Sequence, residues 1–135
     1  MRKIGLAILL ALVSACSPGN DVPTATAAAD NFHKQFNAGD YVTIYDTSDK
    51  LLKNAAPSKD FVALLAGVRS KLGEYQKAEA PGWNDQVTTN GHFVTLIYHS
   101  KFARADAEEN FVFRIDGGRA VLVGWHINSQ ALIQN

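Results

Sequence analysis

The sequence contains little of what would mark a disulfide-rich, membrane-spanning or nucleic-acid-binding protein. Its single cysteine, Cys16, allows no disulfide bond within the chain. Its longest apolar run, IGLAILLALV at residues 4–13, has about half the length that a helix needs to cross a bilayer. The basic residues are scattered along the chain, so we expect no basic face for nucleic acid. These absences direct attention to small globular domains.

Sequence motifs of known catalytic mechanisms are also missing. There is no nucleophile elbow, phosphate-binding glycine loop or dinucleotide fingerprint. The four histidines, His33, His92, His99 and His126, show neither HxH nor HExxH spacing, and no second cysteine is available as a ligand. We therefore expect no metal and no cofactor, and we expect His33 to lie on a helix surface. Between an enzyme and a non-catalytic binding protein, the sequence favours the binding protein.

The composition is that of one folded domain. Of the 135 residues, 47% are hydrophobic and 19% are charged, which suits a single core and excludes a disordered chain. Basic and acidic residues number 13 each, and without Arg2 and Lys3 the counts become 11 and 13. A net charge near −2 gives no reason to expect nucleic acid as a partner.

The N-terminus has the layout of a secretory signal peptide. Arg2 and Lys3 precede the apolar run, and the small residues Ser14 and Ala15 follow it. Val13-Ser14-Ala15-Cys16 resembles the bacterial lipobox, with Val13 where Leu is usual. The resemblance implies that Cys16 is the first mature residue and carries acyl chains such as palmitate. Since each buried methylene contributes about 0.8 kcal/mol, such an anchor would be stable.

The lipobox also implies a location and a division of the chain. Ser17, rather than Asp, follows the cysteine, which in the resemblance favours the outer membrane, facing the periplasm. We expect a signal peptide at residues 1–15, a lipidated tether at 16–23 and one domain at 24–135. The tether contains Pro18, Gly19 and Pro23, residues typical of a linker.

Helical patterns fill the first half of the domain. One helix is expected from about residue 23, capped by Thr24 or Thr26 and ended by Gly39. Asp40 would cap a second, short helix, and residues 46–57 read as a polar connection. A third helix begins at Ser58 and stops at Gly73, and its apolar positions have helical spacing. Its predicted core stripe is Phe61, Leu64, Leu65, Val68 and Leu72.

The second half alternates with the period of β-strands. Asn90-Gly91 predicts a hairpin with a type I′ turn, and Asp116-Gly117-Gly118 predicts another. Residues 74–88 are expected to hold one strand broken near Pro81-Gly82. In the last strand, one face is predicted to carry Val121, Val123, Trp125 and Ile127. Helices followed by antiparallel strands make an α+β fold, with the N-terminal helices packed on a curved β-meander.

This order of elements resembles the cystatin-like, nuclear-transport-factor-2-like cone. The resemblance rests on the break at Asn37-Ala38-Gly39-Asp40-Tyr41, on Leu72-Gly73, on the two hairpin turns and on Val123-Gly124-Trp125-His126-Ile127. It covers about residues 24–130 and is closest to small bacterial lipoproteins of unknown function in that superfamily. The superfamily includes isomerases, dehydratases and assembly domains, so the resemblance implies a fold and a possible pocket but no activity.

The candidate pocket residues lie mainly on the strands. His99, Arg114 and His126 would form a polar cluster if the strand register brings them together, with Tyr98 and Trp83 as further candidates. The alternative is that the two histidines and Arg114 occupy a half-solvated sheet face. Asp46 with a nearby tyrosine, or Asp85 with His99, are further enzymatic pairings that the sequence leaves open.

Two functions follow from these observations. The first is a membrane-anchored lipoprotein of the cell envelope, with a non-catalytic binding or envelope-accessory domain. The second is a small periplasm-facing enzyme, isomerase-like or hydrolase-like, with a polar pocket in the cone. Expected partners are the membrane, through lipid on Cys16, and a protein or small molecule of unknown identity. A homodimer through the sheet face is also open.

Overall fold

In the described part of the chain, helices precede the strands, as the sequence predicts, and one further short helix follows the last strand. The computed structural model describes residues 19–134, so the predicted signal peptide and Cys16 lie outside the described residues. The described elements are α1 (Val22–Ala38), α2 (Tyr41–Asp46), α3 (Lys50–Ala55), α4 (Ser58–Leu72), β1 (Tyr75–Ala78), β2 (Gly82–Thr88), β3 (Gly91–Phe102), β4 (Asp106–Asp116), β5 (Arg119–Asn128) and α5 (Gln130–Ile133). None of these helices is both long and apolar enough to span a membrane.

The first two helices meet where the glycine signal places them. Gly39 has a φ of 73° in the left-handed region and ends α1, a conformation that glycine adopts without strain. The start of α1 differs from the prediction, because the helix begins at Val22 after Asp21. Thr24 and Thr26 therefore lie inside the helix, and the Thr26 hydroxyl donates to the Val22 carbonyl. The structured part thus begins before the predicted boundary at residue 24.

The predicted polar connection at residues 46–57 contains a helix. The Asp49 carboxylate accepts a hydrogen bond of 2.9 Å from the Leu51 N–H and so caps α3. Leu52 buries the apolar side of this short helix. In α4 the predicted stripe is correct except at Leu64, which is 48% exposed. Short helices like α3 escape a search for periodicity because one turn shows no repeat.

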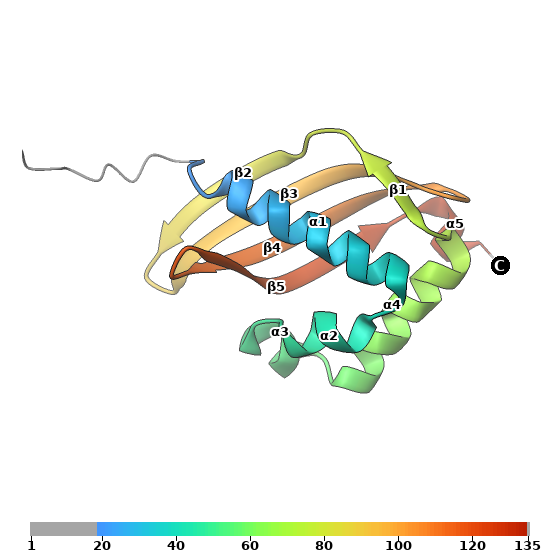
Figure 1. Ribbon diagram of the computed structural model, residues 1–135, viewed down its shortest axis with the longest axis horizontal. Coiled ribbons are helices and arrows are strands. Elements are labelled where there is room, and N and C mark those ends of the chain that lie inside the picture. The colour runs from blue at the N-terminus through green and yellow to red at the C-terminus, as the bar shows by residue number, and fades with distance from the viewer. Residues whose placement is uncertain (1–18, 135) are drawn as a thin grey trace, which may run out of the picture.

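All strands of the described chain belong to one antiparallel sheet, shown in Figure 1 with α1 lying across one face. Both β1 and β2 pair with β3, β1 with its C-terminal end and β2 with its N-terminal end. They are therefore one edge strand interrupted near Pro81, as expected. β4 pairs with β3 and β5. Helix α1 contacts β1, β3, β4 and β5, so this face of the sheet, the inner face, is covered.

The two hairpins differ in their turns. Gly117 and Gly118 both have positive φ values, 56° and 75°, as a type I′ turn requires. In the other hairpin Thr88 pairs with Gly91, so the loop residues are Thr89 and Asn90. Asn90 does not have a positive φ, and the predicted type I′ turn is wrong there because the loop lies one residue earlier.

A β-bulge changes the predicted faces of the last strand. The register between β4 and β5 shifts after Val112, so that Phe113 pairs with Leu122 and Val112 with Gly124. The extra residue, Val123, turns Leu122 toward the core together with Trp125. The predicted apolar face was therefore right for Trp125 and wrong for Val121 and Val123. The core also contains a row of aromatic rings from Phe32, Phe36, Phe102, Phe111 and Phe113.

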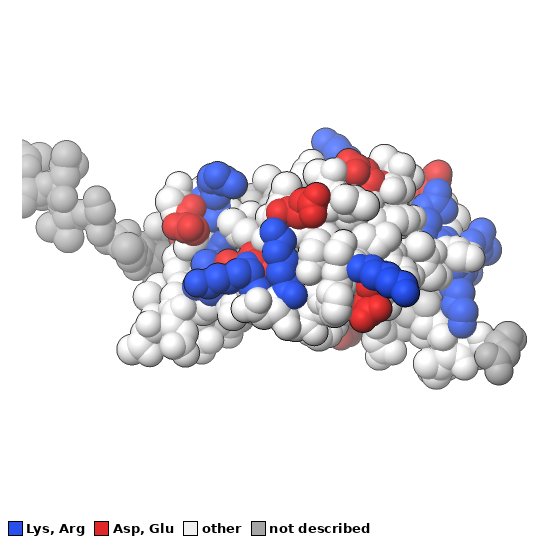
Figure 2. All heavy atoms as spheres, turned by 90° about the horizontal axis from the view of Figure 1, so that it is seen from below, with Lys and Arg blue, Asp and Glu red and all other residues white. Residues whose placement is uncertain are grey.

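The surface carries charges of both signs. Figure 2 shows blue and red side chains interspersed over one side of the domain, with uncharged surface between them. No large field of one sign is visible in that view, in line with the balanced composition.

Candidate functional site

The inner face of the sheet holds a buried carboxylate. Glu109 of β4 is 0% exposed and accepts three hydrogen bonds from three other elements. The donors are His33 Nε2 of α1 at 2.8 Å, Ser100 Oγ of β3 at 2.6 Å and Trp125 Nε1 of β5 at 2.9 Å. Because an unpaired buried carboxylate is unfavourable by several kcal/mol, these donors make its position possible. We call these four residues the Glu109 network.

Strand register explains how the network forms. Glu109 lies directly opposite Tyr98 on β3 and Ile127 on β5. Ser100 lies two residues after Tyr98, and Trp125 lies two residues before Ile127. Both are on the face of Glu109, where diagonal neighbours come within reach of each other. Helix α1 crosses above and brings His33 down onto the carboxylate. The network therefore links the helix to three strands at the centre of the core.

Two tyrosines border the Glu109 network. The His33 ring stacks on Tyr75 at 3.5 Å between centroids with an angle of 3° between the rings. Tyr98 is 4% exposed, and its hydroxyl has no hydrogen-bond partner among the described residues. Burial, with the nearby Glu109 charge acting in the same direction, raises the pKa of Tyr75 to about 12. Burial also raises the pKa of Tyr98 to about 12. Both phenols are neutral at physiological pH.

Sequence reasoning missed the Glu109 network, and the prediction that His33 lies on a helix surface is wrong. His33 is 3% exposed. A signal was present, because His33 continues the row of buried residues Ala25 and Ala29 at a spacing of four. Glu109 likewise alternates with Ala107 and Phe111 on the buried face of its strand. A charged residue in an apolar stripe indicates a buried pair, but the sequence does not show which residue completes it.

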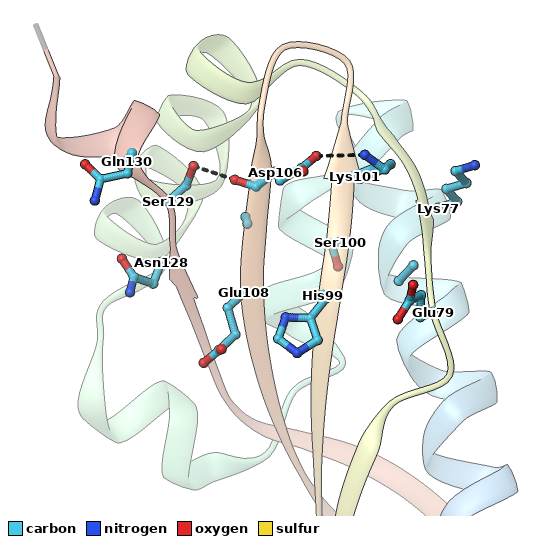
Figure 3. A pocket seen from close by; sticks show the side chains of 12 residues that line it. Lys77, Glu79, His99, Ser100, Lys101, Asp106, Glu108, Asn128, Ser129 and Gln130 are labelled. Atoms are coloured by element: carbon cyan, nitrogen blue, oxygen red, sulfur yellow. Dashed lines mark hydrogen bonds and ion pairs between the residues drawn. The ribbon is translucent and has the colours of Figure 1, made fainter.

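A second candidate site lies on the opposite, outer face of the sheet. It is a groove of about 670 Å³, and its walls come from β1, β3, β4 and the start of α5. We call it the outer groove, and its charged or amide side chains are those of Lys77, Glu79, His99, Lys101, Asp106, Glu108, Asn128 and Gln130. Figure 3 shows His99 and Glu108 side by side in its centre. Lys77 and Glu79 lie to one side of them, and Asn128 and Gln130 to the other.

Internal contacts hold only part of this groove. Lys101 Nζ lies 3.4 Å from Asp106 Oδ1, and Ser129 Oγ donates to the Asp106 carbonyl at 2.7 Å. His99 and Glu108 are direct neighbours across β3 and β4, and both are exposed. The groove thus offers a ligand from solvent both positive and negative side chains, together with amide hydrogen-bond donors and acceptors.

The structure does not bring His99, Arg114 and His126 into one enclosed pocket. His99 lines the outer groove, while His126 is exposed and lies opposite Asn110. Arg114 is opposite Phe93, six residues along β3 from His99, which corresponds to about 20 Å of strand. The three residues are separated because strand pairing places them at different points along the length of the strands.

Arg114 has its own partners instead. Its Nε donates to Asp49 Oδ2 at 2.9 Å, its Nη1 donates to the Asn90 carbonyl at 3.2 Å, and its guanidinium lies 4.9 Å from the Phe93 ring centre. Burial raises the pKa of Asp49, but the Leu51 N–H and the Arg114 guanidinium outweigh it. The pKa of Asp49 therefore lies below its ordinary value of 3.8. This pair fixes α3 to the sheet.

The remaining candidates fall in separate places. Tyr98 is buried beside the Glu109 network, and Trp83 is 51% exposed on β2. Asp46 is exposed at the end of α2. Asp85 lies opposite Val94 and bonds to His92 rather than His99.

Asp21, Asp85 and His92 form the one group of possible metal ligands found among the described residues, with ligand atoms within 4.8 Å of one another. His92 Nε2 lies 2.5 Å from Asp85 Oδ1 and 3.6 Å from Asp21 Oδ2. The other Asp85 oxygen accepts the Gly19 N–H at 2.8 Å. Since both Asp85 oxygens are already engaged, these contacts are explained by attachment of the N-terminal segment to the β2–β3 hairpin. Carboxylate and imidazole are nevertheless ligand types that zinc accepts.

The protein is an α+β domain with a buried carboxylate that accepts three hydrogen bonds and with an open polar groove. The chain belongs to a family of proteins of unknown function, DUF4019, whose family model matches residues 28–125. The matched region contains His33, Ser100, Glu109 and Trp125. No curated protein and no solved structure matches the chain.

Proposed function

We propose that this protein is a bacterial lipoprotein, anchored through acyl chains on Cys16, whose domain binds a polar ligand or protein segment without catalysing a reaction. The observation that carries the proposal is the contrast between the two sites. The outer groove is open and polar, whereas the buried Glu109 already accepts three hydrogen bonds.

The arrangement of the Glu109 network favours a structural role over catalysis. A nucleophilic serine needs its hydroxyl to donate to a base that is within reach of substrate. Here Ser100 Oγ donates to the carboxylate rather than to His33. Neither Glu109 nor His33 lines the outer groove, the open depression beside Arg114 or the small cavity of about 200 Å³ between α1 and the β4–β5 hairpin. A substrate in any of these cavities would not contact the pair. Ser100 is the member of the Glu109 network that lines the outer groove, and its hydroxyl is held by the Glu109 carboxylate.

The chemistry of the outer groove suits a ligand that carries both charges and amide groups, such as an extended peptide segment. Lys77 and Lys101 supply cations, and Glu79 and Glu108 supply carboxylates. Asn128 and Gln130 offer amide groups that donate and accept hydrogen bonds. We assign the domain to the cystatin-like, nuclear-transport-factor-2-like cone, supported by the N-terminal helices on one face of an antiparallel meander. We place it in the cell envelope, at the outer membrane facing the periplasm.

Ligand binding at the groove can be tested with the full-length protein in detergent. We would measure the melting temperature with a library of envelope peptides and metabolites. A ligand of the groove should raise the melting temperature of the wild type and of the control variant Asp60→Asn, which changes an exposed residue of α4. It should raise that of His99→Asn and Glu108→Gln much less. A ligand that stabilises all four proteins equally, or one that is chemically converted, would contradict the proposal.

A homodimer through the sheet face would cover the same groove. Sedimentation at increasing protein concentration should show a monomer. If the wild type is a dimer and Glu108→Arg is a monomer, the occupant of the groove is a second copy of this chain and not a different molecule.

The anchor has an independent test. Cys16→Ser should leave the precursor uncleaved and prevent incorporation of an alkyne fatty acid, because the sulfur that receives the lipid is gone. Normal processing of this variant would contradict the lipoprotein assignment.

A further inference from the structure

The distance between the proposed lipid and the folded domain is short. Gly19 is the first described residue, and only Ser17 and Pro18 separate it from Cys16. Three steps along a fully extended chain cover about 11 Å at most. Gly19 therefore lies no more than about 11 Å from the residue that would carry the acyl chains. The predicted eight-residue tether, fully extended, would reach about 28 Å.

Gly19 is also fixed relative to one end of the sheet. Its N–H donates to Asp85 of β2, and Asp85 bonds in turn to His92 of β3. The Trp83 ring packs so closely on Gly19 that a β-carbon at that position would come within 2.8 Å of it. Figure 1 shows the start of α1 beside β2. The end of the molecule that faces the lipid is thus the β2–β3 hairpin.

Strand β2 exposes apolar side chains and carries little charge. Trp83, Asp85 and Val87 are each two residues apart on β2 and therefore share one face of the strand. Trp83 is 51% exposed and Val87 is 74% exposed. Asp85, the one charged residue of β2, is engaged by Gly19 and His92. The other side chains of the strand and its turn, such as Asn84, Gln86 and Asn90, are uncharged. Few charges of β2 itself would therefore lose water among lipid headgroups. The charged groups beside the turn, such as Lys50, Arg114 and Asp116, line the neighbouring depression.

We propose that the β2 surface around Trp83 and Val87 lies against the membrane, with the Trp83 ring at the level of the headgroups. The inference rests on the proposed lipidation of Cys16 and adds an orientation to it. Tryptophan is enriched at membrane–water interfaces because its ring is apolar and its N–H is polar. The acyl chains supply the affinity, and the short connection brings this surface to the bilayer.

The orientation has a consequence for the outer groove. Gly91 at the hairpin turn lies about 26 Å along β3 from His99. Trp83 lies opposite Leu96, so it is three residues, or about 10 Å, from His99 along the same strand. The groove would then lie further from the bilayer than the hairpin turn and remain open to a soluble partner.

Two exposed positions at opposite ends of the molecule provide a matched test. Val87 is 74% exposed and Ile133 of α5 is 75% exposed, and α5 lies at the end away from β2 (Figure 1). Val87→Cys and Ile133→Cys would each be made in the full-length lipoprotein and labelled with an environment-sensitive fluorophore. The proteins would be reconstituted in vesicles of phosphatidylethanolamine and phosphatidylglycerol, with and without brominated lipids as quenchers.

We expect a blue shift and quenching at position 87 and neither at position 133. Equal signals at the two positions, or quenching at 133 alone, would overturn the orientation while leaving the anchor in place. Wild-type protein serves as the check on the anchor, since a thioether at Cys16 takes up no thiol-reactive dye. Labelling of the wild type would overturn the anchor and the orientation with it.

Intrinsic fluorescence gives a second readout without any new cysteine. The other tryptophan, Trp125, is 5% exposed in the core, so brominated lipids should quench Trp83 selectively. Quenching should disappear in Trp83→Phe. If the wild type and Trp83→Phe are quenched to the same relative extent, Trp83 is not at the interface.

Discussion

Glu108 and Glu109 are adjacent on β4, and they lie in opposite environments. Glu108 is exposed beside His99 in the outer groove, whereas Glu109 is 0% exposed and accepts hydrogen bonds from His33, Ser100 and Trp125. The period of two in a strand sends one to each face. The same side chain therefore offers a ligand contact on one face and joins four elements on the other.

The comparison also separates what each carboxylate contributes to stability. A solvated surface charge adds little to the free energy of unfolding, since water already satisfies it. A buried charge contributes through the donors it holds, and removing one partner leaves the others unpaired in the core. The predictions below test this difference, from the largest effect to the smallest.

Substitution of the buried carboxylate should have the largest effect. Glu109→Ala leaves three buried donors without an acceptor and opens a cavity, so we expect the free energy of unfolding to fall by about 3–5 kcal/mol. Glu108→Ala, the matched control on the next residue, should change it by less than about 0.5 kcal/mol. Urea denaturation followed by circular dichroism measures both. Similar losses for the two variants would contradict the contrast between the faces.

Removal of the histidine should have a smaller effect and depend on Glu109. His33→Phe keeps an aromatic ring against Tyr75 and loses one donor, so we expect a loss of about 1–3 kcal/mol. In the presence of Glu109→Ala the same change should matter less, with a coupling of about 1–3 kcal/mol in a double-mutant cycle. Additive losses would show that His33 stabilises the fold through packing alone.

The Asp49–Arg114 pair lies between the two extremes, because it is partly buried. Asp49→Asn keeps the cap of α3 and removes the charge, so the expected loss at neutral pH is about 1 kcal/mol or less. The folded pKa lies below 3.8, so the contribution of the pair is complete above that pH. It is lost as the pH falls through the folded pKa. The unfolding free energies of wild type and Asp49→Asn should converge in acid; a constant difference would exclude the charge as the cause.

The smallest effect, and one of opposite sign, is expected at Tyr98. Among the described residues its buried hydroxyl makes no hydrogen bond of ordinary geometry, since the nearby Thr26 hydroxyl donates to Val22 instead. Tyr98→Phe should therefore stabilise the fold by up to about 1 kcal/mol. Because the folded pKa is raised from 10.0 to about 12, the wild type should lose stability as the pH rises from 10.0 toward 12. That part of the loss should be absent in Tyr98→Phe. Destabilisation by this variant at neutral pH would indicate a bond to the hydroxyl.

Much of the fold could be predicted from local patterns. Gly39 and Gly73 mark the ends of α1 and α4 because both need backbone conformations that glycine adopts easily. Alternation correctly predicted antiparallel strands in the second half of the chain. The prediction failed at α3, which is only six residues long, and at Val123, where a bulge reverses the alternation. Neither feature repeats, so periodicity does not reveal it.

The candidate sites were less predictable than the fold. His99 was singled out and does line a groove, but Arg114 and His126 lie elsewhere in the register. His33 and Glu109 are 76 residues apart in the sequence, and no local pattern relates them. The proposed orientation relative to the membrane likewise depends on the bond between Gly19 and Asp85, 66 residues apart.

The sequence by itself determined the α+β order of elements, most of their ends and the lipobox-like segment around Cys16, which lies outside the described residues. These features are encoded in neighbouring residues, through backbone preferences and apolar spacing. Only the tertiary structure decided which polar residues meet: the Glu109 network, the outer groove and the contact of Trp83 with Gly19. Each of these depends on strand register and on the path of α1 across the sheet, which many weak long-range contacts fix together.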